Sequence, residues 1–379
     1  MTKRFPRFEL EDYFRRFAFK QDMVNLSPSN PISPTVGEIL QMAGRPPTAL
    51  QGLSLDYSET AGARPLREAI AGLYVDLEPE QVIVTSGGVE AIMLTLEALI
   101  QPGTGVVLET PIYGSYEPLL RLLGAQITYY ELAEGDAYEY DFERLERLVL
   151  DNRAELLVVN PYNNPTGRGI ASTAALSSLT ELSSRTGCKV ISDEVFRQVT
   201  INGDPLPSLL DGAQDAIVIS DMTKAWGLGG LRIGWMACRD SSLLERALNT
   251  RDFTTNSNSI VSEELAVYAL SARVPLLEAS LAKAREALSD LTRFIADSHG
   301  VLAWHPPIGG YCAWLAVNVA AGMSVPDLCT RLAETQGYLI LPGVVFGTQW
   351  SRFLRVGLAA GGKQLLAGLD AFLQEADAT

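Results

Sequence analysis

The chain has 379 residues, of which 47% are hydrophobic and 20% charged, a composition typical of a globular protein with one large domain and a smaller one. Its net charge of −15 repels nucleic acids and anionic membranes, so we expect neither as a partner. Residues 1–17 are amphipathic and mixed in charge, unlike a signal peptide, and no apolar run approaches the length of a membrane-spanning helix.

Cysteine and histidine usage limits the kinds of site that the chain can form. Cys188, Cys238, Cys312 and Cys329 include no close pair and no metal-ligand spacing, and only two histidines are present. A zinc or iron site is therefore not expected. Three of the cysteines lie among apolar residues, so we expect buried free thiols in a reducing, cytoplasmic compartment.

Short apolar runs alternate with helical patterns through the middle of the chain. The predicted strands are rich in Val, Ile and Leu and span residues 82–85, 105–109, 155–160, 189–192, 216–220 and 232–237. Helical patterns lie between them at residues 88–100, 116–123 and 173–186. Continuous apolar strands are typical of a mostly parallel sheet that is covered by helices on both faces. The pattern therefore predicts a three-layer α/β domain.

The pattern divides the chain into three parts. Residues 1–45 are expected to form an N-terminal arm and part of a small domain, and residues 46–270 a large domain. Residues 271–379 are expected to complete the small C-terminal domain. One long helical pattern covers residues 262–298, and a final helix is predicted over residues 363–375.

A single lysine segment, SDMTKAWGLGGLRIGW (220–235), carries the strongest chemical signal. Lys224 directly follows a predicted strand, and Arg232 follows it across three glycines. A lysine that forms a Schiff base must be held at a fixed point, and an anionic group beside it needs a cation and open backbone. This segment supplies all of these parts.

A second segment, TSGGVEAI (85–92), places Ser86, Gly87 and Gly88 between a strand and the start of a helix. Free amides at a helix N-terminus, with no Cβ in the way, can bind phosphate. Glycines at such a position can also serve only the turn, and the segment alone does not decide between these interpretations.

Further motifs follow the same order as in one known superfamily. They are YSETAGARPLREAI (57–70), TPIYGSYEP (110–118), NPYNNPTG (160–167), ISDEVF (191–196) and RFLRVGL (352–358). Together with the lysine and glycine segments they resemble the fold-type I aminotransferase superfamily (class I/II), whose enzymes carry pyridoxal 5′-phosphate (PLP). The resemblance covers residues 57–355 and implies a fold-type I architecture: a three-layer domain with a mostly parallel sheet, and a smaller α/β domain built from the chain termini.

The resemblance assigns roles to residues around the cofactor. It implies that Lys224 forms the Schiff base and that Asp193, at a strand end, pairs with the protonated ring nitrogen. It implies that Asn164 donates to the pyridine hydroxyl oxygen and that Tyr113 stacks on the ring. Considered alone, Asp193 could equally cap a helix and Tyr113 could simply pack. Arg232 resembles a phosphate ligand.

Two further roles concern the substrate and a neighbouring subunit. Tyr57 resembles a tyrosine that reaches the phosphate of the neighbouring subunit, which implies a homodimer with a shared active site. Arg355 resembles the arginine that grips the α-carboxylate of an amino acid substrate in a bidentate fork.

One departure from the family pattern is Phe196, where transaminating members usually have a tyrosine that donates to the phenolate oxygen of the cofactor. Without this donor, Asn164 alone stabilises the phenolate, and the Schiff base should hold its proton to higher pH. An ordinary aminotransferase that tolerates the substitution is the alternative interpretation.

A second departure is Asp221, where the family commonly has a phosphate-binding serine. A carboxylate beside a phosphate dianion must turn away or meet a cation, and the guanidinium of a substrate would be such a cation. Thr223 keeps a hydroxyl next to the lysine, so phosphate binding need not be lost. Glu9, with Glu11 and Asp12 in the N-terminal arm, could also face a substrate, or these acids could only complete a helix dipole.

Phe196, the arm (FELEDYFRRF, 8–17) and LPGVVFG (341–347) with RFLRVGL narrow the resemblance to cyclases of guanidino amino acids, of the capreomycidine synthase type. This implies elimination of a side-chain hydroxyl from a hydroxylated arginine, followed by ring closure through the guanidine. A class I/II aminotransferase that forms a 2-oxo acid and a PLP-dependent arginine oxidase are alternatives. A transcription factor with an aminotransferase-like domain would need a basic winged-helix segment, whereas this arm is short and acidic.

Overall fold

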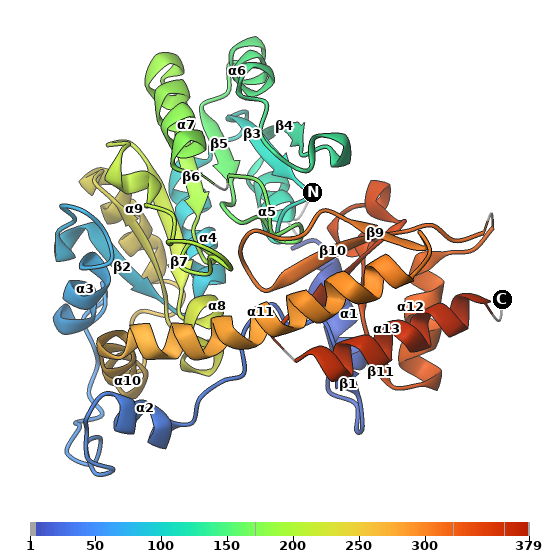
Figure 1. Cartoon of the computed structure of the whole chain (residues 1–379). Helices are drawn as coiled ribbons and strands as arrows, with labels where there is room; N and C mark the ends of the chain where they lie inside the picture. Colours follow the sequence, from blue (N-terminus) through green and yellow to red (C-terminus); the bar gives the residue numbers. More distant parts are fainter. Residues whose placement is uncertain (1–4, 171, 321, 360, 378–379) are drawn as a thin grey trace.

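A seven-stranded sheet with the order β2-β8-β7-β6-β5-β3-β4 organises the larger part of the computed structural model (Figure 1). The structure describes residues 5–170, 172–320, 322–359 and 361–377. β8 runs antiparallel to its neighbours β2 and β7, and the other pairings are parallel. The strands are β2 (Val82–Thr85), β3 (Gly105–Thr110), β4 (Gln126–Glu131), β5 (Leu156–Val159), β6 (Lys189–Asp193), β7 (Ile217–Asp221) and β8 (Gly234–Cys238).

Alternating strand residues enter two separate hydrophobic layers, one on each face of this sheet. In β3, Val106 and Leu108 pack in one layer and Val107 in the other. The first layer is completed by α4 (Gly88–Leu99), α5 (Tyr116–Leu123) and α9 (Ser241–Arg251). The second contains side chains of α3 (Arg64–Ala71), α6 (Phe142–Asp151), α7 (Thr173–Thr186) and α10 (Ile260–Ser271). The expected three-layer α/β fold with a mostly parallel sheet is confirmed.

Two elements differ from the sequence expectations. The single helix expected over residues 262–298 is wrong, because α10 and α11 (Arg273–Asp297) meet at a bend of 76°. Pro275 lies in the first turn of α11, where its ring clashes with the preceding turn and it has no amide to donate, so the helix cannot run through. β4 was not among the predicted strands, because this edge strand is half-exposed and lacks a continuous apolar run.

A smaller sheet with the order β12-β13-β10-β9 lies beside the C-terminal helices, and the N-terminal segment joins this region (Figure 1). The strands are β9 (Leu302–Trp304), β10 (Cys312–Val317), β12 (Leu341–Pro342) and β13 (Phe353–Gly357), and the helices are α12 (Val325–Thr335) and α13 (Gly362–Asp377). β1 (Val24–Asn25) pairs in parallel with β11 (Tyr338–Leu339). α1 (Glu9–Phe17) buries Phe17 against Ala333 and Leu339, so the arm is attached to the C-terminal part of the chain.

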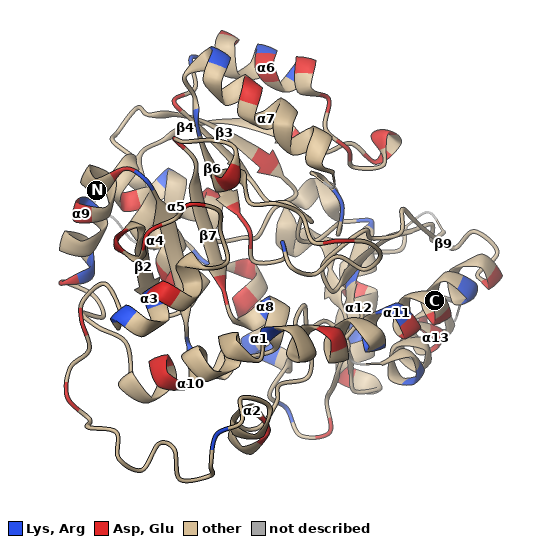
Figure 2. Ribbon diagram, turned by 60° about the vertical axis from the view of Figure 1, so that its left-hand side comes forward, with Lys and Arg blue, Asp and Glu red and all other residues tan. Residues whose placement is uncertain are grey.

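The remaining helices and the surface complete the description. α2 (Val36–Met42) and the one-turn α8 (Thr223–Trp226) lie near α10 and α11 in Figure 1. Acidic and basic residues alternate on outer helices such as α6, as Figure 2 shows. Within the described chain no single helix is long and apolar enough to cross a membrane, and α10 with α11 pass that test of length and composition only as a bent pair.

Candidate active site

Two adjoining cavities lie at the carboxyl ends of β5, β6 and β7, the edge at which open α/β sheets bind ligands. We name them the Asp193 cavity and the Arg355 cavity. They share Glu11, Tyr113, Asn164 and Lys224. The Asp193 cavity is also lined by Gly88, Val89, Ile92, Asn160, Asp193, Val195, Asp221, Thr223 and Arg232, and the Arg355 cavity by Leu10, Phe14, Asn25, Pro28, Ser29, Asn30 and Arg355.

Lys224 is held by hydrogen bonds to its backbone and to its amine. Oδ1 of Asp221, the last residue of β7, accepts from the amides of Thr223 at 2.8 Å and Lys224 at 3.3 Å, and so caps α8. Nζ of Lys224 donates to Oγ of Ser29 at 3.0 Å. Burial lowers the pKa of Lys224, which increases the share of neutral, nucleophilic amine.

Asp193 ends β6 as a buried carboxyl at the wall of the cavity. Its Oδ2 accepts from the hydroxyl of Tyr116 at 2.9 Å, and its Oδ1 from the amide of Val195 at 3.3 Å. Burial raises the pKa of Asp193 to about 7. A cation placed against this carboxylate would stabilise the charged form, and the protonated nitrogen of a pyridine ring is a cation of that kind.

A chain of amides links Asp193 to Arg355. Asn160 donates from Nδ2 to the carbonyl of Asp193 at 2.7 Å and accepts at Oδ1 from the amide of Asn164 at 2.8 Å. Oδ1 of Asn164 accepts from Nη1 of Arg355 at 2.8 Å, and Nη2 donates to the carbonyl of Ser27 at 2.8 Å. The Nε atom of Arg355 is buried without a hydrogen-bond partner among the described residues. Arg355 therefore retains a donor for an anion such as a carboxylate.

The turn before α4 has the form of a phosphate site. Gly87 has a φ of 82°, and a Cβ there would lie 2.2 Å from Nη2 of Arg232. Arg232 donates to the carbonyl of Ser86 at 3.2 Å and is exposed at the cavity. Open backbone, a helix N-terminus and a cation thus meet at one place. The amide of Ser86 donates to Glu90 at 2.5 Å, and Ser86 is not among the residues that line the two cavities.

The N-terminal arm covers both cavities. Phe8 meets the ring of Tyr113 edge-on at 5.5 Å, and Glu11 on α1 lines both cavities. Glu9 lies elsewhere, in a separate hollow where its carboxylate is 3.8 Å from Arg7. On a helix, residues 9 and 11 point to different sides, so only one of them can face the cavities. The structure places Glu11, rather than Glu9, at the site.

Two other residues from the sequence analysis lie outside these cavities. Phe196 is 1% exposed and packs in the core beside Gly310, while its neighbour Val195 lines the Asp193 cavity. Tyr57 is 85% exposed, although the adjacent Ser58 is anchored to the buried carboxylate of Glu263. The loop thus holds Tyr57 away from the cavities of its own subunit.

The sequence analysis missed several buried polar residues. Ser29, Tyr116 and Asn160 contact Lys224, Asp193 or Asn164, as described above. Behind them, Glu109 accepts hydrogen bonds from Asn163 and from the amide of Asn160, and burial raises the pKa of Glu109 to about 8. Tyr116 and Asn160 belong to motifs already quoted, and only their partners were unknown.

The cysteines described are free and buried, as expected. Within the ranges that the structure describes, no group of three or more His, Cys, Asp or Glu residues could hold a metal ion. The polar groups at the site therefore comprise carboxylates, amides, hydroxyls and the two kinds of basic side chain.

Replacing Asp193 with Asn should change how stability depends on pH. The folded protein keeps the Asp193 proton up to about pH 7, whereas a carboxyl with the ordinary pKa of 3.8 releases it earlier. Stability from this group is therefore complete below about pH 4 and is lost as the pH rises to about 7, by up to about 4 kcal/mol. Without PLP, the Tm of Asp193→Asn should gain on the wild type over this range. Parallel Tm curves would refute the assignment, and Glu109 contributes equally to both proteins.

Comparisons with known proteins agree with this geometry. The family model for aminotransferase class I and II matches residues 21–369. Capreomycidine synthase of Streptomyces vinaceus is 30% identical over 372 residues, 98% of this chain and 94% of that protein. Arginine–pyruvate transaminase of Pseudomonas aeruginosa is 26% identical, over 91% of this chain and 88% of that one. The crystal structure of the PLP-dependent cyclase OrfR is 30% identical and covers 98% of each chain with a TM-score of 0.90. The chain is therefore a PLP-dependent enzyme of the aminotransferase class I and II family.

Proposed function

We propose that the enzyme converts a hydroxylated arginine into a cyclic guanidino amino acid, by elimination of the side-chain hydroxyl and intramolecular addition of the guanidine. The observation that carries this proposal is the pair of carboxylates, Glu11 and Asp221, that line one cavity together with Lys224. Capreomycidine synthase and the cyclase OrfR, at 30% identity each, support it.

The residues present fit PLP. The buried acid, the amide at the cavity wall, the aromatic ring, the open glycine turn with its arginine, and the lysine supply a partner for each part of the cofactor. They are Asp193 for the ring nitrogen, Asn164 for the ring hydroxyl, Tyr113 for the ring face, Gly87, Gly88, Thr223 and Arg232 for the phosphate, and Lys224 for the aldehyde carbon. In a homodimer, Tyr57 of the partner subunit would add a further phosphate ligand.

Bound PLP supplies an electron sink that stabilises negative charge at the substrate Cα. Lys224, once released by the substrate amine, removes the Cα proton with Nζ, because its lowered pKa favours the neutral amine. Asp193 holds a proton on the ring nitrogen, and Arg355 grips the substrate carboxylate. The leaving hydroxyl takes a proton and departs as water, and a guanidine nitrogen forms the new bond, so that no oxidant is needed.

Recognition of the guanidinium follows from the charges at the site. Asp221 is 9% exposed, and its Oδ1 is occupied by the amides of α8, which leaves Oδ2 for a ligand. Glu11 enters the same cavity from the arm. A substrate with a neutral side chain would leave these carboxylates partly buried without a cation, which is unfavourable. A guanidinium satisfies both, because its planar donors pair with carboxylates in a fork.

A second candidate is transamination of an arginine-type amino acid. The similarity to arginine–pyruvate transaminase favours it, because Lys224, Asp193 and Arg355 serve either reaction. The two reactions diverge only after the Cα proton is removed. Phe196, which presents no hydroxyl at the cavity, is the residue that we propose distinguishes this enzyme from a transaminase.

A substrate screen tests the proposed reaction. Arginine, its hydroxylated forms and common amino acids are incubated with the holoenzyme, and product masses are recorded. We expect a hydroxyarginine to yield a product lighter by one water, with the α-amine retained. A 2-oxo acid formed only with an amine acceptor would instead establish transamination. Consumption of oxygen would establish an arginine oxidase.

Replacing Glu11 with Gln should weaken binding of guanidino substrates. Loss of a charged hydrogen-bond partner costs about 1.5–3 kcal/mol, so the KM should rise roughly tenfold to a hundredfold. Glu9→Gln is the matched control on the same helix and should leave the KM near the wild-type value, because Glu9 faces another hollow. Equal effects of the two variants would show that α1 does not select the substrate.

Replacing Asp221 with Asn separates its two contacts. An Asn side chain keeps an oxygen that can cap α8, so the lysine should stay in place and the PLP absorbance should persist. The negative charge is lost, and kcat/KM for guanidino substrates should fall by at least about tenfold. Unchanged kinetics would remove Asp221 from guanidinium binding.

A further inference from the structure

Ser29 is the residue that receives the amine of Lys224. The donor–acceptor distance of 3.0 Å joins atoms of residues 195 positions apart, and both side chains line the Arg355 cavity. Ser29 is 6% exposed. A buried hydroxyl at this position contacts the atom that must both bind the cofactor and move a proton.

The segment that carries Ser29, residues 24–32, is fixed to the C-terminal part of the chain. We call this segment the strap. The amide of Gly357 donates to the carbonyl of Leu26 at 2.7 Å, and a Cβ at Gly357 would lie 2.0 Å from the carbonyl oxygen of Pro28. Arg355 donates to the carbonyl of Ser27. The strap therefore cannot move away from β13 without breaking these contacts.

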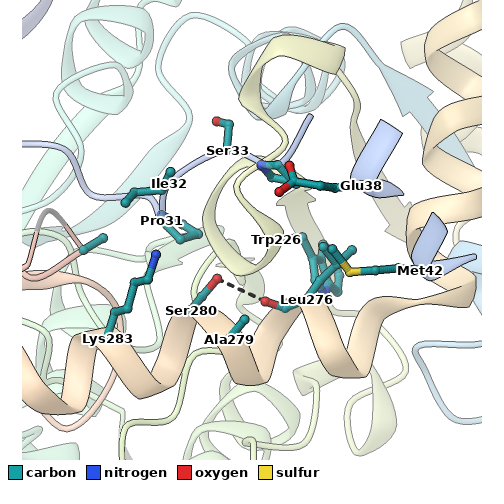
Figure 3. Close-up of a pocket in the computed structure, with 12 residues that line it drawn as sticks. Pro31, Ile32, Ser33, Glu38, Met42, Trp226, Leu276, Ala279, Ser280 and Lys283 are labelled. Carbon is teal, nitrogen blue, oxygen red and sulfur yellow. Dashed lines mark hydrogen bonds between the residues drawn. The ribbon is translucent and has the colours of Figure 1, made fainter. Parts of the chain in front are cut away.

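The strap also packs against the far end of α8. A Cβ at Gly227, which ends that helix, would lie 3.1 Å from the carbonyl oxygen of Ile32 and 3.3 Å from Pro31. Figure 3 shows Pro31, Ile32 and Trp226 around one hollow that α11 closes from below. Ser29 is thus presented to Lys224 by a segment that is held on both sides of the cavity.

We propose that Ser29 is a positioning residue that holds the amine of Lys224 toward the Arg355 cavity whenever the lysine is not bound to the cofactor. This proposal rests on the proposed role of Lys224. A hydroxyl oxygen accepts a stronger hydrogen bond from an ammonium group than from a neutral amine. Ser29 therefore favours the protonated form of Lys224 and gives that form one fixed place.

Other groups around Lys224 act on the same proton. Burial lowers the pKa of Lys224, Arg355 adds to this effect, and the acidic groups oppose it. The thiol of Cys312 stays neutral, because burial raises its pKa. The titratable and charged groups that face Lys224 are Asp221 from β7, Asp193 from β6, Cys312 from β10, Arg355 from β13 and Glu11 from α1.

The test measures exchange of the substrate Cα proton with heavy water by mass spectrometry, over a range of pH, with the holoenzyme. Exchange reports proton transfer by Lys224 and does not require product release. In Ser29→Ala the acid limb of the exchange rate should move about one pH unit lower, because the ammonium loses a charge-assisted hydrogen bond. Ser29→Thr keeps the hydroxyl and should restore the wild-type profile. Ser33→Ala, in the exposed segment that follows, should leave the profile unchanged.

An acid limb of Ser29→Ala that superimposes on the wild-type curve would overturn the proposal, as would a shift that Ser29→Thr shares with it. The resting absorbance of bound PLP, measured for every variant, shows whether the cofactor site is intact. Lys224→Ala separates the two proposals. If this variant still exchanges the Cα proton, the proposed role of Lys224 fails, whatever Ser29 does.

Discussion

The structure depends on keeping one buried lysine amine at a defined point. The backbone of Lys224 is fixed by the side chain of Asp221 and its amine by Ser29. These two contacts come from opposite sides, one from the end of β7 and the other from the N-terminal strap. Asp193 and Asn164 occupy the ends of neighbouring strands, so parallel strands bring the other polar groups to the same edge of the sheet.

The site combines three cations with three carboxylates in a partly buried space. Arg232 and Arg355 lie where anionic groups are expected, at the glycine turn and beside the strap. Glu11 and Asp221 need cations of their own. Asp221 also explains why an acid can replace a hydroxyl in this motif, since one of its oxygens already caps α8. The family assignment therefore defines the cofactor, and the unpaired carboxylate oxygens define the class of side chain that we propose for the substrate.

Much of this was predictable from the sequence, for physical reasons that also explain the failures. Strands buried on both faces are continuous apolar runs and were found, whereas the half-exposed β4 was not. The helix expected over residues 262–298 ignored Pro275. Motif positions identified Lys224 and Asp193, but the partner of Lys224 is 195 residues away, and local patterns carry no information on such contacts. For the same reason, the arm sequence could not decide which of its acids faces the cavities.

The central claim is that Lys224 carries the cofactor at the centre of these contacts. The most direct measurement is reduction of the holoenzyme with borohydride, which makes the link between cofactor and lysine permanent, followed by proteolysis and mass mapping. The account predicts that the pyridoxyl group is found on the peptide that contains Lys224 and on no other. Its recovery on a different lysine, such as Lys189 or Lys283, would contradict the account.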